Sequence, residues 1–185
     1  MSPEIALIVG AGAGLSASLA RLLAREGFHV ALAAREPGKL AALAHEVDAL
    51  ALPCDATVAT EVEAAFAAVE KKWRVPDLAV FNASYRVRGP FVGLDPAEVE
   101  RTLAVSAFAG FLVGQAAARR MLARGSGAIF FTGASASVKG YAESAPFAMG
   151  KFALRGLAQS YLAVYRQPRS AWSWELELRP WVERF

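Results

Sequence analysis

Three glycines alternate with alanines in the turn Gly10-Ala11-Gly12-Ala13-Gly14. A candidate strand over residues 4–9, apolar at every position after Glu4, precedes the turn, and an Ala- and Leu-rich stretch that ends near Gly27 follows it. Such a strand, tight turn and helix bring the backbone close to a pyrophosphate, which then sits on the free N–H groups of the helix N-terminus. A tight turn without any ligand is the alternative. We favour a dinucleotide site, because further strands and helices alternate after the turn.

The end of the second predicted strand bears on the choice between the two nicotinamide dinucleotides. Folds that bind NAD usually carry an acid there for the ribose 2′-hydroxyl, about 20 residues after the glycines. This chain has Ala34 in that place, followed by Arg35. An arginine suits a 2′-phosphate, because its guanidinium forms charge-assisted hydrogen bonds. We therefore favour NADP(H) over NAD(H), with a solvated arginine at a strand end as the alternative.

The elements that must position these residues alternate along the chain. Strands are predicted at 4–9, 28–34, 50–53, 78–81 and 128–132, and helices after the glycine turn and at 36–47, 58–73, 96–124 and 144–165, the third of these four with a break near Ser106. Strands that are apolar at nearly every position are buried on both faces, as in a parallel sheet covered by helices. The pattern predicts one α/β domain over residues 1–185, a Rossmann-like doubly wound parallel sheet with helices on both faces.

Composition excludes several other classes of protein. The 185 residues are 55% apolar and 20% charged, so the chain can fill a core and is neither disordered nor a disulfide-rich miniprotein. The net charge of +3 is scattered along the chain, so we expect no nucleic-acid partner. Two histidines and one cysteine, Cys54, give no metal-binding pattern. Without a basic leader or an uninterrupted membrane-length apolar run, we expect a soluble cytoplasmic protein and no membrane partner.

Four short motifs resemble those of the short-chain dehydrogenases/reductases, and together they cover nearly the whole chain. They are the glycine turn, in which Ser16 replaces the last glycine, Asp55 after the third strand, Asn82-Ala83-Ser84 after the fourth, and Phe147-Ala148-Met149-Gly150-Lys151 on the last helix. The resemblance implies that Asp55 recognises the adenine amino group and that Lys151 holds the ribose hydroxyls. The residues expected to contact the cofactor are Gly10, Gly12, Gly14, Leu15, Arg35, Asp55, Asn82, Ala83 and Lys151.

The resemblance also implies hydride transfer between NADP(H) and a carbonyl or alcohol substrate. In this family a tyrosine moves the proton, a lysine lowers the pKa of that tyrosine, a serine positions the substrate oxygen and an asparagine completes the relay. Only the lysine is kept here, as Lys151. The tyrosine position holds Phe147, the serine position Ala134 and the asparagine position Ser106. Nearby substitutes are Ser135, Ser137, Tyr141 and Tyr85, although ordinary half-buried loop tyrosines are the alternative for the last two.

The last residues depart from the family, which continues with two further strands and a segment that covers the substrate. Residues 172–178 alternate apolar and polar side chains, which predicts a sixth strand with one polar face, and five residues follow Pro180. We expect incomplete C-terminal strands and an atypical tail at 168–185 in place of the covering segment. A shifted or shortened reading frame and an edge that binds a partner are alternatives.

Two functions remain open. The first is an NADP-dependent oxidoreductase with weak or altered catalysis on an unknown small carbonyl or alcohol, since loss of general acid–base catalysis costs about 10²- to 10⁴-fold and leaves slow turnover. The second is a catalytically silent dinucleotide-binding or scaffold protein of the same fold. Family members commonly assemble through two long helices, so the resemblance allows a homo-oligomer through residues 96–124 and 144–165. Packing of the same helices on the sheet is the alternative.

Overall fold

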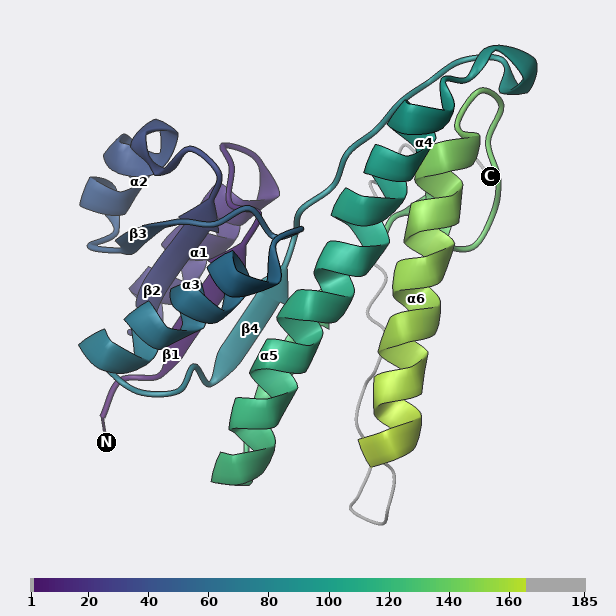
Figure 1. Ribbon diagram of the computed structural model, residues 1–185. Coiled ribbons are helices and arrows are strands. Elements are labelled where there is room, and N and C mark those ends of the chain that lie inside the picture. The colour runs from purple at the N-terminus through teal and green to yellow at the C-terminus, as the bar shows by residue number, and fades with distance from the viewer. Residues whose placement is uncertain (1, 166–185) are drawn as a thin grey trace.

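The computed structural model describes residues 2–165, with side chains as far as residue 160. Its centre is a parallel sheet (Figure 1). The strands are β1 (Ile5–Val9), β2 (His29–Ala34), β3 (Leu50–Pro53), β4 (Leu78–Phe81) and β5 (Ala128–Phe131). Their order across the sheet is β3-β2-β1-β4-β5, and every neighbouring pair is parallel. This confirms the predicted Rossmann-like α/β class.

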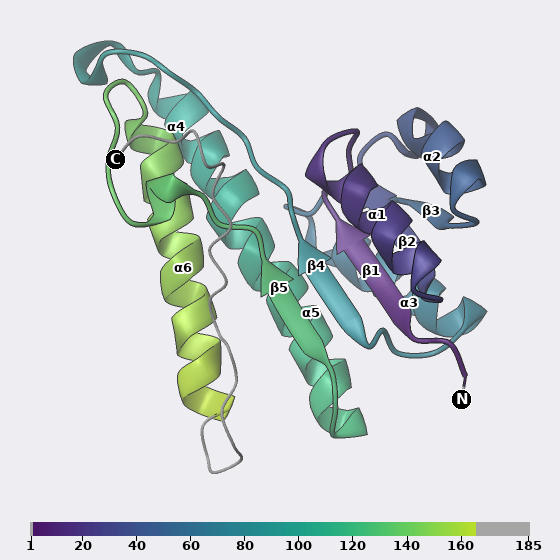
Figure 2. The ribbon, with the colours of Figure 1, turned by 180° about the vertical axis from the view of Figure 1, so that it is seen from behind.

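Helices cover both faces of the sheet, as predicted. On one face lie α1 (Leu15–Arg25) and α2 (Ala41–Glu46), and on the other lie α3 (Ala59–Lys72), α5 (Ala109–Arg124) and α6 (Ala145–Tyr165). Seen from behind, β5 runs beside β4 at the edge of the sheet, with α5 packed across it (Figure 2). The helical α4 (Pro96–Leu103) leads into α5. The three layers are thus helices, sheet and helices.

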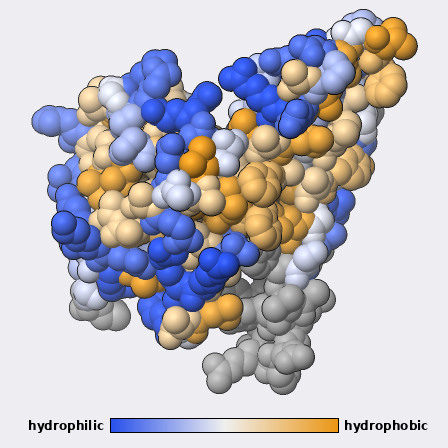
Figure 3. Space-filling model, viewed as in Figure 1, coloured by the Kyte–Doolittle hydropathy of each residue, from blue (hydrophilic) through white to orange (hydrophobic). Residues whose placement is uncertain are grey.

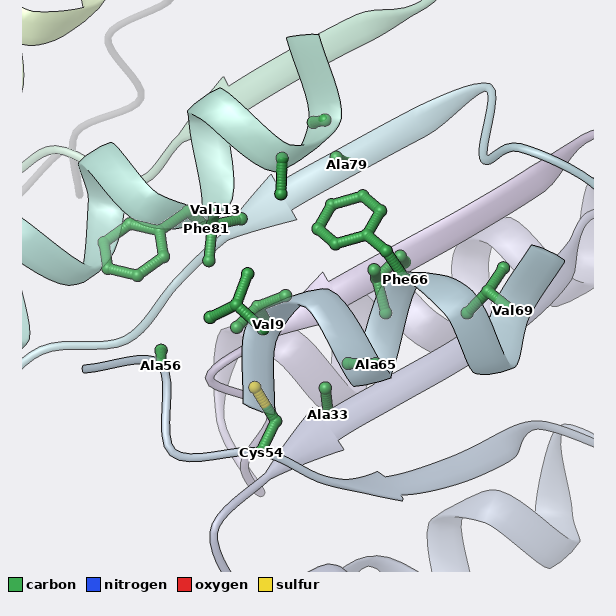
Figure 4. Close-up of a cluster of buried hydrophobic side chains, with 14 of the residues drawn as sticks. Val9, Ala33, Cys54, Ala56, Ala65, Phe66, Val69, Ala79, Phe81 and Val113 are labelled. Carbon is green, nitrogen blue, oxygen red and sulfur yellow. The ribbon is translucent and has the colours of Figure 1, made fainter. Parts of the chain in front are cut away.

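Alternation along β1 explains the two cores. Leu7 and Val9 belong to the cluster under α3 and α5, whereas Ile8 belongs to the cluster under α1 and α2, and all three are buried. Figure 4 shows the first cluster, in which Phe66 of α3 and Phe81 of β4 fill the space between sheet and helices. Because successive strand residues point to opposite faces, a continuous apolar run is what a sheet covered on both sides requires.

The predicted break near Ser106 is a π-helical turn at Ala104–Phe108 between α4 and α5. Helix α6 packs closely against this turn. A Cβ built on Gly150 of α6 would lie only 2.8 Å from the Cβ of Ser106. The glycine therefore lets the last helix pack against the widened turn. Such turns interrupt the regular ladder of backbone hydrogen bonds and often occur at functional sites.

One predicted helix differs from the structure, and one predicted strand cannot be compared with it. The helix predicted at 36–47 is a 3₁₀ turn, Pro37–Leu40, followed by the short α2, because proline and glycine at its start disfavour a regular α-helix. The strand predicted at 172–178 and the atypical tail at 168–185 lie outside the described residues. The boundaries of the predicted strands agree with the structure to within one residue.

One stretch within residues 2–165, the helical run Pro96–Arg124, is long and apolar enough by composition to cross a membrane. Its apolar side chains include Ala109 and Val113, which are fully buried against the sheet. A core helix meets the same criterion of length and hydropathy, so this run is weak evidence for a membrane span.

Candidate dinucleotide site and active site

The loops after β1 and β4 meet at the point where the strand order reverses. Gly10 follows β1 with a positive φ of 82°, and a Cβ built on it would lie 2.3 Å from the backbone nitrogen of Ala83, in the loop after β4. Only glycine permits both this conformation and this approach. In open α/β sheets, ligands bind in the crevice outside the carboxyl ends of the strands at such a reversal.

A side-chain hydrogen bond joins the same two loops. The Asn82 amide Nδ2 donates to Ser16 Oγ over 2.7 Å, and Ser16 Oγ donates to the carbonyl of Gly10 over 3.4 Å. Ser16 is buried in the first turn of α1. The serine that replaces the family's last glycine therefore links the glycine turn to the Asn82 loop.

The other two glycines of the turn face open space. A Cβ on Gly12 or on Gly14 would meet no atom within 4 Å. Gly14 is the N-cap of α1, and no side chain caps the N-terminus of this helix. Free backbone N–H groups and the positive end of the helix dipole favour an anion there. The turn therefore has both the room and the hydrogen-bond donors that a pyrophosphate needs.

Two of the residues assigned to the adenosine end lie at the ends of β2 and β3. Asp55 Oδ1 accepts hydrogen bonds from the backbone N–H and hydroxyl of Thr57, and these lower the pKa of Asp55, with a smaller contribution from the charge of Arg35. Arg35 is exposed directly after β2. Its guanidinium forms no hydrogen bond with any residue that the structure describes. The guanidinium of Arg35 thus lies near enough to Asp55 for its charge to act on that carboxylate, and its N–H donors form no hydrogen bond with the described residues.

Lys151 is almost completely buried, with 3% of its surface exposed. Its Nζ donates to the backbone carbonyl of Thr132, which follows β5, over 2.7 Å. Burial lowers the pKa of the Lys151 amine to about 8. The amine is thus held at the carboxyl end of β5.

The side chains that the resemblance places at the other three catalytic positions are Phe147, Ala134 and Ser106. Phe147 lies one helical turn before Lys151, and the amine of Lys151 is 5.8 Å from its ring centroid. Ala134 and Phe147 carry no hydroxyl. Ser106 is fully buried, and its Oγ has no hydrogen-bond partner among the described residues.

The substitutes for the missing groups differ in their surroundings. Ser137 Oγ accepts a hydrogen bond from the backbone N–H of Ala134, so it is engaged within its own turn. The hydroxyl of Tyr85 donates to Glu98 over 2.6 Å, and this bond raises its pKa. Tyr141 is exposed, with Lys139 over its ring. Ser135 is only partly exposed, at the start of a short 3₁₀ turn, Ser135–Ser137.

Comparison with known proteins identifies the relatives of this fold. The family model of short chain dehydrogenases matches residues 4–168. The chain belongs to the short-chain dehydrogenase family. It is 27% identical over 161 residues to D-threitol dehydrogenase of Mycolicibacterium smegmatis and 29% identical over 171 residues to trans-4-hydroxycyclohexanecarboxylate dehydrogenase of Sinomonas cyclohexanicum. These alignments cover 84% and 86% of this chain but only 62% and 66% of the relatives.

Solved structures of the short-chain dehydrogenase family share the fold. A short-chain dehydrogenase from Rhodopseudomonas palustris has a TM-score of 0.86 and 32% identity, with 96% of this chain and 99% of that chain covered. An actinorhodin polyketide ketoreductase with NADPH has a TM-score of 0.85 and 27% identity, with 89% and 66% covered. Members of the family bind nicotinamide dinucleotides.

Sequence reasoning missed one cation of this region. The guanidinium carbon of Arg86 lies 4.9 Å from the ring centroid of Phe147, although sixty residues of chain separate the two. No motif marks Arg86, because its position depends on the path of an irregular loop. The link from Asn82 to Ser16 was also missed, although the serine itself is visible as a departure from the family's glycine.

We predict that Gly10→Ala lowers the free energy of unfolding by at least about 3 kcal/mol, because it adds a backbone clash to the strain of a positive φ. Gly27→Ala is the matched control, since Gly27 has a φ of 88° and open space around its Cβ. It should cost only about 1–2 kcal/mol. Urea unfolding followed by circular dichroism measures both. Equal losses would show that the contact with Ala83 is unimportant.

The burial of Lys151 predicts a pH dependence of stability. Its pKa is about 8 when folded and 10.5 when unfolded, so between these values the unfolded chain binds the extra proton and stability rises with pH. Lys151→Met should remove this rise, so that the difference between the two proteins changes by about 3 kcal/mol across the window. Lys71→Met, at an exposed lysine of α3, should keep the wild-type profile. Parallel curves for wild type and Lys151→Met would contradict the burial effect.

Proposed function

We propose that the protein is an NAD(P)-dependent oxidoreductase that transfers hydride between the cofactor and a small carbonyl or alcohol compound. The observation that carries this proposal is the meeting of the open glycine turn, the Asn82 loop and the buried Lys151 amine at the carboxyl ends of β1, β4 and β5. The nicotinamide, when bound, supplies the hydride. Gly12 and Gly14 would hold the pyrophosphate, Asp55 the adenine and Lys151 the ribose.

The proton transfer is weak or altered in this proposal. Phe147 has no proton to give, and Ala134 cannot hold the substrate oxygen. Solvent, or a residue such as Ser135 or Tyr141, would have to replace these groups. A catalytically silent dinucleotide-binding or scaffold protein is the second candidate, and it is favoured by the same two residues. Cofactor binding is common to both candidates, so the rate of reduction separates them.

For the cofactor we propose NADP(H) in preference to NAD(H). Arg35 is exposed at the end of β2 and forms no hydrogen bond within residues 2–160, so its donors are free for a 2′-phosphate. The preceding residue, Ala34, offers no carboxylate to a ribose 2′-hydroxyl. The related ketoreductase structure contains NADPH, which agrees with this choice.

We further infer a single domain over residues 1–185 and a cytoplasmic protein without nucleic-acid or membrane partners.

Apolar side chains gather over α5 and α6 in Figure 3. Phe108, Phe111, Met149 and Phe152 are all exposed, and the first two stack on one another at 6.3 Å. Burying this surface against a second copy would remove apolar area from water, which supports a homo-oligomer through the two long helical segments.

The cofactor proposal predicts that NADPH binds at least about tenfold more tightly than NADH, a difference of ~1.4 kcal/mol. Arg35→Asp should reverse this order, because a carboxylate repels the 2′-phosphate and accepts from the ribose hydroxyl. Lys39→Asp is a control for the change of charge, since Lys39 lies nearby and is paired with Glu36. Calorimetric titration measures all six affinities. Equal affinities of the wild type for both cofactors would refute the preference, and absence of binding would refute the proposed function.

The catalytic proposal predicts that Phe147→Tyr combined with Ala134→Ser raises the rate of NADPH-dependent ketone reduction by about 10²- to 10⁴-fold. The new hydroxyl would lie one turn from the Lys151 amine, whose positive charge favours the phenolate. Adding Lys151→Met to this pair should cancel most of the gain. Rates follow from the absorbance of NADPH. If the wild type already reduces ketones at ordinary rates and the double change lowers them, weak catalysis is wrong.

A further inference from the structure

Arg86 holds its guanidinium over the ring that replaces the family's tyrosine. The guanidinium carbon is 4.9 Å from the centroid of Phe147, and Nη2 donates to Ser144 Oγ over 3.4 Å. Ser144 is itself buried, directly before α6. The amine of Lys151 is 5.8 Å from the same centroid, so both cations lie against the ring of Phe147.

The loop that carries Arg86 is tied to the segment before α6. Gly89 lies three residues after Arg86, and its backbone N–H donates to the carbonyl of Glu143 over 3.1 Å. The hydrogen bond to Ser144 and the contact with Phe147 are a second and a third connection between these segments. Three connections to residues 143–147 thus position the guanidinium.

No carboxylate neutralises Arg86 in the part of the chain that the structure describes, and its side chain forms one hydrogen bond there. By contrast, Arg21, Arg74 and Arg120 are each paired with an acidic side chain. A guanidinium has five N–H donors, so most of those of Arg86 are unused. These donors lie at the place to which a substrate must come if Phe147 marks the tyrosine position.

From these contacts we propose that Arg86 binds a carboxylate of the substrate, so that the preferred substrates are oxo acids or the corresponding hydroxy acids. The proposal rests on the proposed function, because it places the reacting carbonyl beside Phe147 and Lys151. A planar guanidinium recognises a carboxylate through two parallel hydrogen bonds, which fixes the orientation as well as the position of the ligand. A nearby carbonyl is then presented to the cofactor in a defined way.

Binding of oxo acids and of their uncharged esters tests this proposal. The probes are 2-oxopentanoate and 4-oxopentanoate, each paired with its methyl ester, titrated by calorimetry into the full chain with and without saturating NADPH. We expect at least one acid to bind tenfold or more tightly than its ester. Arg86→Gln should abolish this difference, whereas Arg88→Gln, at an exposed arginine of the same loop, should preserve it.

The outcomes separate this inference from the proposed function. NADPH binding is first measured in each protein by nicotinamide fluorescence, and its absence in the wild type refutes the proposed function. In that case, the titrations of acids and esters without cofactor still decide whether Arg86 binds carboxylates. If NADPH binds but neither acid is preferred to its ester, the role of Arg86 is wrong. An equal loss for acid and ester in Arg86→Gln also overturns it, because the guanidinium would then act on the carbonyl oxygen alone.

Discussion

The close approach of Gly10 to Ala83 is the constraint on which the rest of the site depends. It sets how near the loops after β1 and β4 lie, and both loops carry groups assigned to the cofactor. The approach is possible because β1 and β4 are neighbours in the sheet although they are far apart in the sequence. Their pairing is in turn held by residues such as Leu7 and Ile8, which are buried under opposite helical layers. A slip of one residue would exchange these two faces, so packing of both cores defines the geometry of the turn.

Lys151 shows a second constraint, the cost of a buried charge. Desolvation alone lowers its pKa to about 8, and the carbonyl of Thr132 is its hydrogen-bond partner. A buried cation without a carboxylate partner destabilises a fold, so strongly shifted groups in a crevice are candidates for function. The π-helical turn at Ala104–Phe108 is a comparable departure from regular structure. It brings the hydroxyl of Ser106, which has no hydrogen-bond partner within the described part of the chain, against Gly150, the residue next to Lys151.

Regular elements could be predicted from the sequence because their signals are local. The strands are nearly continuous apolar runs, and their alternation with helices is typical of a parallel sheet covered on both faces. The roles of particular loop residues could not be predicted in the same way. Whether the hydroxyl of Ser137 faces a substrate or the N–H of Ala134 depends on one short turn. Arg86 meets Phe147 only because an irregular loop crosses to α6, and no periodic pattern encodes such a path.

Phe147, at the position where the resemblance implies tyrosine, lies beside the guanidinium of Arg86, and the two side chains differ from a phenol in what they offer a ligand. A phenol can deliver a proton, whereas a guanidinium stays charged at all ordinary pH values and can only donate hydrogen bonds. In the proposed site, Arg86 would hold negative charge, whereas Phe147 would offer no group to neutralise it by protonation. Arg86 is exposed, so solvent reaches the same region and can supply the proton slowly. If Arg86 binds a carboxylate as we propose, one arrangement would account both for recognition of an anionic substrate and for slow turnover, because the guanidinium holds the ligand but gives it no proton.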